Sequence, residues 1–423
     1  MKIIDYNNNK SRKYLEKFLE KRRSRKNINL SIVDKILRDV KKTKIRAVVK
    51  YEKRFSKNTK IYPKKSEINE SIKLLDPKVK KAIDFAYKRI LKFHKLQKVK
   101  DINYVDSLRN KIQYRNVVVD SVGLYVPANL PSTALMVGVP AVIAGVKRII
   151  LANPRHNGKL NPAVMYVAKK LGIKNILSVG GAQAIASMAY IHKTSKIFGP
   201  GNDFVARAKQ LVFGDVGIEG AIMGPSEVTV VADSATNVDH AVTSIAAQQE
   251  HGLNSQCILI SKDKKFIQKF KKRIFKAINT FPRAKIVREG LRKNGIIIYA
   301  KKDSHIIEAI NLMICPEHLE LLNKDCKKYI PKIKNAGCIG LNKYSPVASS
   351  DYAVGVNHTL GVMGSSKFAS GLNLNDYYKK ISMFSLTKKG VEVIGKKAIT
   401  LAEYENLKFH ALSIKSRMKR GKD

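Results

Sequence analysis

The chain has 423 residues and a formal net charge of +48 at pH 7, and 44% of its residues are hydrophobic but only 7% aromatic. A chain of this length is too long to fold around one small hydrophobic core, which predicts two or three domains. No apolar run of about 18 residues occurs, which argues against a membrane span. The opening "MKIIDYNNNKSRKYLEKF" lacks the apolar segment of a secretory signal. The four cysteines form no CxxC pair, which is typical of reduced thiols in the cytoplasm.

The large positive charge favours anionic partners in general, and nucleic acid is the first to consider. The lysines, however, are spread along the whole chain, and neither an RNP-type aromatic pattern nor zinc-finger spacing occurs. Runs such as "KRRSRK" (21–26) and "SRMKRGKD" (416–423) are more typical of solvated faces and tails. We therefore interpret the charge as a Lys-rich bias and expect no specific nucleic-acid partner.

Residues 1–120 are Lys-rich and mostly helical in their hydrophobic period. The clearest helix is "DPKVKKAIDFAYKRILKFHKLQ" (76–97), in which Asp76 is a suitable N-cap and Pro77 takes the first helical position. The composition changes sharply at residue 121. From there to 154 the pattern predicts a Gly/Pro turn, an apolar helix and a short strand at 148–151.

Helices and short apolar strands then alternate, with glycine at strand ends. This alternation is typical of a doubly wound parallel sheet, and two rounds of it predict two such α/β domains. The predicted strands are 175–179, 227–234, 256–261, 295–300 and 337–342, and the predicted helices are 161–172, 237–252 and, as a polar tail, 399–420.

Polar side chains gather at the end of one small-residue helix, in "AAQQEHGLNSQ" (246–256). On a helix, Gln248 and His251 stand three residues apart and share a face. An amide oxygen beside an imidazole is compatible with a helix cap, a buried hydrogen-bond pair or half of a metal site. The pair alone does not decide among these.

Glycine-containing turns supply further candidates. "GGAQA" (180–184) follows a strand and opens a helix, so its amides are candidates to face a phosphate, although it lacks GxGxxG. "GPGN" (199–202) is a tight turn with Asn202 at its exit. "GPSEV" (224–228) places Ser226 just before a strand, without the spacing of a nucleophile elbow. Turns that follow strands are the usual place for sites in such sheets.

Adjacent acid and imidazole groups occur at Glu317 and His318 in "CPEHLELL" (315–322). They suit general acid/base chemistry if a loop lets both converge, whereas the first turn of a helix with a solvated glutamate is the structural alternative. "SSDYAVGVNHTLG" (349–361) adds Asp351 and His358. The tail adds Glu405 and His410.

Taken in order, "YVP", "GGAQAI", "KIFGPGN", "VFGDVGIEG…GPSEV", "QQEHG", "PEHLEL", "DYAVGVNHTLG" and "AEYENLKFH" resemble the motifs of the histidinol dehydrogenase family. The resemblance covers nearly the whole chain and is strongest from 121 to 410. Enzymes of this family use zinc and NAD to oxidise L-histidinol, through L-histidinal, to L-histidine, the last steps of histidine biosynthesis.

The resemblance also implies roles for individual residues. Those matching the ligands of one zinc ion per subunit are Gln248, His251, Asp351 and His410, and those matching the catalytic pair are Glu317 and His318. The positions around the substrate are Ser226, Gln248, His251, His318, Asp351, His358, Glu405 and His410. The NAD site is matched by Tyr125, Gln183 and Asn202. His318 would take the alcohol proton, and Glu317 would activate water for the second oxidation.

The expected fold is two doubly wound, Rossmann-like parallel-sheet domains with a helical N-terminal region and a C-terminal helical tail. The boundaries we expect are 1–30 for an N-terminal arm, 31–120 with 227–375 for a larger α/β domain holding most zinc and catalytic residues, 121–226 for the NAD-associated domain and 376–423 for the tail. The family further implies a cytoplasmic homodimer in which this tail crosses to complete the partner's active site.

Several departures from the family pattern leave alternatives open. "ANLPST" follows "YVP" directly and shortens a loop, and "NHTLGV" replaces a more usual Leu-Pro-Thr. One alternative is a related zinc- and NAD-dependent enzyme for another polar alcohol, for example a sulfonated diol. Another is a non-catalytic, polyanion-binding descendant. Cys315 beside the catalytic pair could form a thiohemiacetal, although a packed small residue is the commoner role.

Overall fold

The computed structural model describes residues 1–23, 31–97, 99–219, 224–279 and 281–418. The chain divides into two compact units. The first comprises Met1–Leu96 and Asp120–Asn373, and the second comprises Gln97–Val119 and Leu374–Asp423. No described helix is both long enough and apolar enough to cross a membrane.

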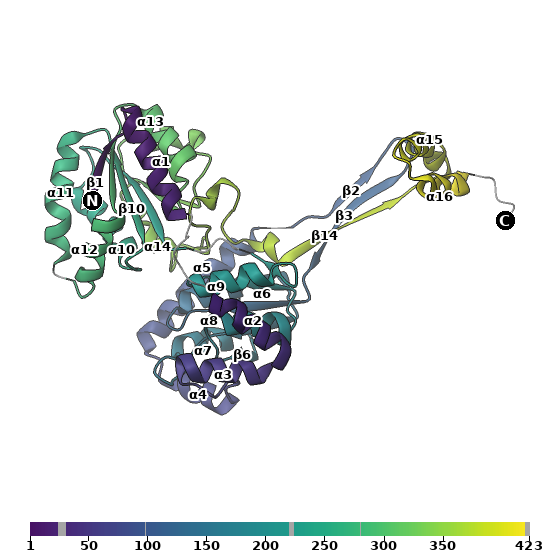
Figure 1. Cartoon of the computed structure of the whole chain (residues 1–423), viewed down its shortest axis with the longest axis horizontal. Coiled ribbons are helices and arrows are strands. Elements are labelled where there is room, and N and C mark those ends of the chain that lie inside the picture. The colour runs from purple at the N-terminus through teal and green to yellow at the C-terminus, as the bar shows by residue number, and fades with distance from the viewer. Residues whose placement is uncertain (24–30, 98, 220–223, 280, 419–423) are drawn as a thin grey trace. The chain divides into compact units, whose positions relative to one another are not determined.

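A six-stranded, wholly parallel sheet organises half of the first unit (Figure 1). Its central strands are buried along their whole length, as expected of parallel strands covered on both faces. In spatial order the strands are β1 (Lys2–Asp5), β11 (Ile296–Tyr299), β10 (Gln256–Ser261), β9 (Glu227–Val231), β12 (His318–Leu321) and β13 (Cys338–Leu341). Two of these strands, β1 and β12, were not predicted from the sequence. The stretch "KIID" has no alternation, and "HLEL" alternates over only four residues, which is too few to distinguish a strand from a helical turn.

Helices cover both faces of this sheet and bury separate apolar clusters. On one face Leu15, Leu19 and Ile306 pack against Ile260 and Ile298. That face is covered by α1 (Asn9–Arg23), α13 (Asp303–Glu308) and a π-helical turn (Ala309–Ile314), and the other by α10 (Val238–Gln249), α11 (Lys264–Ile278) and α12 (Ala284–Asn294).

A second parallel sheet, of five strands, organises the rest of the first unit. Its order is β6 (Asn175–Leu177), β5 (Arg148–Ala152), β4 (Ser121–Tyr125), β7 (Lys196–Phe198) and β8 (Gly217–Ile218). The helices that share its core are α2 (Ser31–Thr43), α3 (Ile45–Ser56), α8 (Gly181–Ala186) and α9 (Asp203–Val212). Two pairs of helices also pack together. Helix α4 (Lys65–Lys73) packs against α7 (Pro162–Lys170), and α5 (Pro77–Lys95) packs against α6 (Pro131–Ala144).

These sheets confirm the expected α/β fold class, but the N-terminal hundred residues are arranged differently from our division. Residues 1–23 are no arm, because β1 pairs with β11 and Tyr6 lies in the core. Residues 31–56 pack on the five-stranded sheet and not with the larger one, since Val33 and Ile36 of α2 share a core with Leu177. An amphipathic period shows that a helix has a buried face, but not which sheet covers it.

The second unit is a three-stranded antiparallel sheet followed by two packed helices (Figure 1). The sequence pattern did not predict its hairpin, which lies in the stretch expected to be mostly helical. The single helix expected over 399–420 is two helices, separated where Asn406 adopts a φ of 59°. The elements are β2 (Ile102–Val105), β3 (Lys111–Val118), β14 (Tyr378–Ser385), α15 (Lys388–Tyr404) and α16 (Lys408–Met418).

Local signals elsewhere are confirmed. The carboxylate of Asp76 accepts hydrogen bonds from the amides of Lys78 and Val79, and Pro77 begins α5.

Strand order in the five-stranded sheet reverses between β4 and β7, so the carboxyl ends of these two strands form the usual crevice for a ligand. In the six-stranded sheet the order reverses between β9 and β12.

Candidate active site

The peptide group of Glu227, at the start of β9, joins the two residues of the predicted acid/base pair. Its N–H donates to Oε2 of Glu317 at 2.7 Å, and its carbonyl oxygen lies 3.3 Å from Nδ1 of His318. Both side chains are buried, with 7% and 3% exposure. His318 begins β12 beside β9, so the alternative of a solvated first helical turn is wrong.

Two carboxylates determine the charge of His318. Burial by itself lowers its pKa, but Glu317, 3.6 Å from Nδ1, and Asp351, 3.6 Å from Nε2, outweigh burial and hold the pKa well above its usual range. Because a carbonyl oxygen can only accept, the contact with Glu227 assigns a proton to Nδ1. Nε2 has no hydrogen-bond partner among the described residues, and it is the ring atom left to exchange a proton with a ligand.

A second imidazole, that of His358, is held in the neutral form. Burial lowers the pKa of His358, and its Nδ1 donates to the carbonyl oxygen of Asp351 at 2.7 Å. This bond fixes the tautomer in which Nε2 is an acceptor. The site therefore combines an imidazole that favours the charged form with one that favours the neutral form.

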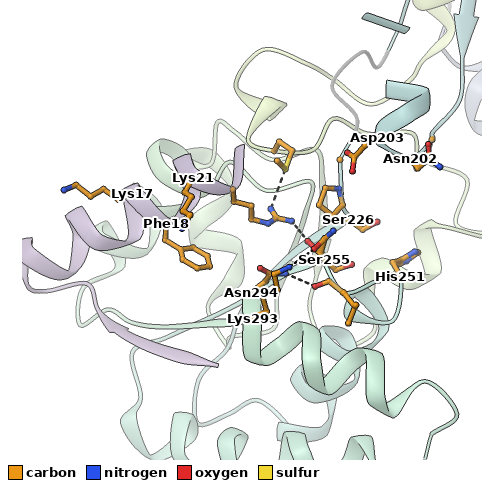
Figure 2. Close-up of a pocket in the computed structure, with 18 of the residues that line it drawn as sticks. Lys17, Phe18, Lys21, Asn202, Asp203, Ser226, His251, Ser255, Lys293 and Asn294 are labelled. Atoms are coloured by element: carbon orange, nitrogen blue, oxygen red, sulfur yellow. Dashed lines mark hydrogen bonds between the residues drawn. The ribbon is translucent and has the colours of Figure 1, made fainter. Parts of the chain in front are cut away.

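These groups line one cavity of about 290 Å³. Its wall also includes Gln248, His251, Ser226 and Asn202. A larger cavity of about 1020 Å³ shares Asn202, Ser226 and His251 with it, and Figure 2 shows these three side chains around the larger opening. The acid/base pair lies at the start of a strand, because Glu317 immediately precedes β12 and His318 begins it.

Three of the four predicted zinc ligands are among the lining residues. Helix α10 ends at Gln249, so His251 lies in the turn after it, where its N–H contacts the carbonyl oxygen of Gln248 at 3.4 Å. The amide oxygen of Gln248, the imidazole of His251 and the carboxylate of Asp351 are a mixed N/O set that suits zinc. Among the described residues no three His, Cys, Asp or Glu side chains are grouped as for a metal. The three predicted ligands that line the cavity include only one histidine and one acidic residue, because the third is the amide of Gln248.

The fourth predicted ligand, His410, belongs to the second unit. Glu405 caps the end of α15 and His410 lies on α16, and both are exposed on that unit. The residues that line the cavity of the first unit do not include them.

The predicted NAD residues lie at the carboxyl edge of the five-stranded sheet. The hydroxyl of Tyr125, at the end of β4, accepts from the amide of Gly181 at 3.2 Å. Glu52 of α3 accepts from the amide of Gly180 at 2.9 Å and from Nε2 of Gln183 at 2.7 Å. These two glycine amides therefore donate to side chains. They are not free to bind a phosphate, contrary to the possibility raised by the sequence. Asn202 caps α9 by accepting from Val205 at 3.1 Å.

A buried lysine supports the turn that carries Asn202. Lys209 of α9 is fully buried, and its Nζ donates to the carbonyl oxygen of Gly199 at 2.5 Å. Burial lowers the pKa of Lys209 to about 7. Gly199 has a φ of 109°, and a Cβ there would lie 1.9 Å from the carbonyl oxygen of Tyr125. The turn therefore requires glycine at 199 and is fixed against β4.

Sequence reasoning missed four of the residues that shape the site: Arg22, Glu52, Lys209 and Glu227. A glutamate opening the apolar strand "EVTVV" was the available signal for Glu227, since an isolated charge in a buried strand needs a partner. Arg22 belongs to the run "KRRSRK", which we expected to be solvated. Its side chain is only 11% exposed, and residues 24–26 of the run lie outside the described residues.

Cys315 gives no support to a covalent role. Its thiol is buried and donates to the carbonyl oxygen of Asn311 at 3.0 Å. Burial also raises its pKa, so the nucleophilic thiolate is disfavoured.

A buried acid/base pair and a neutral imidazole in one cavity, within a unit of two parallel sheets, define an α/β enzyme that moves protons on a small polar ligand. Comparison with known proteins makes the class specific. The family model for histidinol dehydrogenase matches residues 19–418. The histidinol dehydrogenase of Pelagibacter ubique is 50% identical over 99% of this chain and 100% of its own length.

Two further relatives agree. The histidinol dehydrogenase of Rhodospirillum rubrum is 36% identical over 95% of this chain and 94% of its own. The crystal structure of histidinol dehydrogenase from Elizabethkingia anophelis is similar with a TM-score of 0.88 and 35% identity, covering 93% of each chain. The chain belongs to the histidinol dehydrogenase family. The family expected from the motifs is confirmed, and with it an oxidoreductase.

The buried Lys209 predicts a pH-dependent stability. In the unfolded chain this amine titrates near 10.5 and in the folded chain near 7. Between these values the unfolded state binds the additional proton, so the free energy of unfolding rises with pH by up to about 1.4 kcal/mol per pH unit. Lys209→Met should abolish this rise in urea titrations at pH 7 to 10, whereas Lys169→Met, at an exposed position, should keep it. Parallel pH profiles of the wild type and Lys209→Met would contradict the assignment.

Proposed function

We propose that this protein oxidises L-histidinol through L-histidinal to L-histidine, with two NAD molecules and one zinc ion per subunit. The reaction is the last step of histidine biosynthesis. The observation that supports it most is the buried Glu317–His318 pair, held on the peptide of Glu227 in a cavity with Gln248, His251 and Asp351. Family membership supports the same reaction.

The zinc ion would be held by Gln248, His251, Asp351 and His410, and when bound it supplies a positive charge that orients the imidazole and amine of the substrate. The donor types fit that ion, as described above. NAD supplies the hydride acceptor, and we assign its contacts to Tyr125, Gln183 and Asn202. Ser226, His358 and Glu405 complete the assignment as substrate contacts, together with His318 and the metal ligands.

His318 would act through Nε2. Its Nδ1 keeps a proton on the carbonyl oxygen of Glu227, so Nε2 is the atom that takes the proton of the alcohol while hydride leaves the same carbon. The effect of the Asp351 carboxylate on the ring would be offset by the zinc held there, which favours an unprotonated Nε2 before this step. The carboxylate of Glu317, 3.6 Å from Nδ1, stabilises the imidazolium that results. The proton is then released to solvent before the second oxidation.

Glu317 would act on water in the second oxidation. One carboxylate oxygen, Oε2, is occupied by the amide of Glu227, which leaves Oε1 to take a proton from water as it adds to the aldehyde. With that proton on Glu317, the hydrate is an anion, which gives its hydride to the second NAD and its remaining hydroxyl proton to solvent to form the carboxylate. Glu317 then returns its own proton to solvent. The cavity that holds both catalytic residues would retain the aldehyde between the two steps.

The yield of NADH per histidinol tests this function. The wild type should give about two NADH per histidinol, because each oxidation transfers one hydride. Glu317→Gln should give about one and release histidinal, since only the second step needs activated water, whereas His318→Asn should suppress both steps. A full yield of two from Glu317→Gln at an unchanged rate would exclude the water-activating role.

Zinc retention tests the metal assignment separately from turnover. His251→Asn should lower the zinc content of the purified protein by at least about tenfold, because one imidazole ligand is lost. His240→Asn is the matched control, since His240 lies on the preceding helix and outside both cavities. Equal zinc contents of the two variants, measured by mass spectrometry, would remove His251 from the ligand set.

We further propose a homodimer in which the second unit completes the partner's site. The supporting observation is the set of large apolar side chains that this unit exposes. Its exposed large side chains include Ile102, Tyr104, Val105, Ile112, Tyr114, Phe384, Leu401, Tyr404, Phe409 and Leu412. A two-fold dimer would cover this surface and carry two identical composite sites.

Mixing two inactive variants tests the shared site. If His410 serves the partner, a heterodimer of His318→Asn and His410→Asn chains has one doubly damaged site and one intact site. Random exchange should then restore roughly a quarter of wild-type activity. If His410 serves its own chain, every site keeps one defect. An inactive mixture, with subunit exchange verified by native mass spectrometry, would exclude the crossed arrangement.

We place the reaction in the cytoplasm. All four cysteines are unpaired, and three of them are buried, which fits a reducing compartment.

A further inference from the structure

A buried ion pair links the N-terminal helix to the peptide that orients the acid/base pair. Arg22, in the last turn of α1, donates from Nη1 to Oε1 of Glu227 at 2.6 Å. The two side chains are only 11% and 8% exposed. Glu227 is the residue whose backbone contacts both Glu317 and His318. The guanidinium therefore contacts the candidate catalytic groups only through Glu227.

The same guanidinium also holds the turn that follows His251. Its Nη2 donates to the carbonyl oxygen of Asn254 at 2.9 Å. The neighbouring Arg23 donates to the carbonyl oxygens of Met313 and Ile314, at 2.6 and 2.9 Å, just before the segment that leads to Glu317. Figure 2 shows helix α1, with Phe18 and Lys21, beside the wall of the larger cavity that contains Ser226 and His251. The end of α1 thus braces three segments of the site.

The energetic reason for this brace is the burial of Glu227. A buried carboxylate is costly unless it is paired, and removing its partner typically costs more than the pair contributes. Burial raises the pKa of Glu227, Arg22 counters that rise, and the nearby carboxylate of Glu317 adds to it. Without the guanidinium, Glu227 would either keep an unpaired charge beside Glu317 or take up a proton, and in both cases the side-chain contact between the start of β9 and α1 would be lost.

We propose that Arg22 is a positioning residue, which through its ion pair with Glu227 holds the β9 peptide where it orients Glu317 and His318. This inference rests on the proposed function, because it assigns Arg22 to the same reaction. Arg22 does not touch the reacting atoms. Its effect is on the geometry of the two residues that do.

The test compares Arg22 with a second arginine of the same helix. Arg12 also forms an ion pair with a glutamate, Glu308 of α13 at 3.2 Å, but it lies in the first turn of α1 and outside both cavities. A misplacement of about 1 Å at a catalytic group can cost about 100-fold in rate. Arg22→Ala should therefore lower kcat per bound zinc by roughly 10- to 100-fold, with the KM for NAD nearly unchanged. Arg12→Ala should change kcat less than about twofold, even where it lowers the melting temperature as much.

Two further measurements separate positioning from general stability. Arg22→Lys keeps the charge, and its kcat should lie between those of the wild type and Arg22→Ala. Added guanidinium ion at low millimolar concentration should raise kcat of Arg22→Ala and leave Arg12→Ala unaffected. If Arg22→Ala does not fold, Arg22→Lys and Arg12→Lys are compared in the same way, with the loss of kcat expected only for the former.

The outcomes are distinguishable from those for the function itself. A folded Arg22→Ala with wild-type kcat, or equal losses of kcat in the Arg22 and Arg12 variants, would overturn the positioning role. A zinc-loaded wild type that produces no NADH from histidinol would instead overturn the proposed function.

Discussion

One peptide group, that of Glu227, is the constraint on which the site depends. It donates to Glu317 and accepts from His318, so the position of both side chains and the tautomer of the imidazole follow from where β9 begins. The parallel register of β9 and β12 sets this contact, and burial in a covered sheet keeps water from competing for it. A shift of one strand against the other would separate the pair from its only common anchor within the described residues.

The site uses opposite edges of the two sheets. Tyr125 and Asn202 follow strands of the five-stranded sheet, at the reversal of strand order where doubly wound proteins usually bind ligands. Glu227 and His318 instead begin strands of the six-stranded sheet. Residues of both sets line the smaller cavity. In the proposed reaction NAD would bind at the first of these edges and the acid/base groups lie at the second, so hydride and proton would leave one carbon toward different residues.

Local chemistry decided which features the sequence predicts. Asp76 and Pro77 predict the start of α5, and glycine turns between apolar helices and strands predict both parallel sheets. Both signals depend only on residues that are close together in the sequence. The ordered motifs also identify the family and name the candidate site residues. Strand β12 and the bond between Arg22 and Glu227 could not be found this way. The first alternates polar and apolar residues over only four positions, which is also compatible with a helical turn, and the second joins positions 205 residues apart. An arginine in a basic run looks the same whether solvated or buried.

The protonation of His318 reports most directly on the contact with the β9 peptide. Nitrogen-15 NMR of histidine-labelled, zinc-loaded protein, with His318→Asn used to assign the signal, distinguishes the two ring nitrogens. We expect a proton on Nδ1 that is protected by its bond to the carbonyl oxygen of Glu227, and an Nε2 whose signal changes when substrate binds. A ring with its proton on Nε2 and an unprotonated Nδ1 would contradict this expectation, because strand β9 would then not set the tautomer.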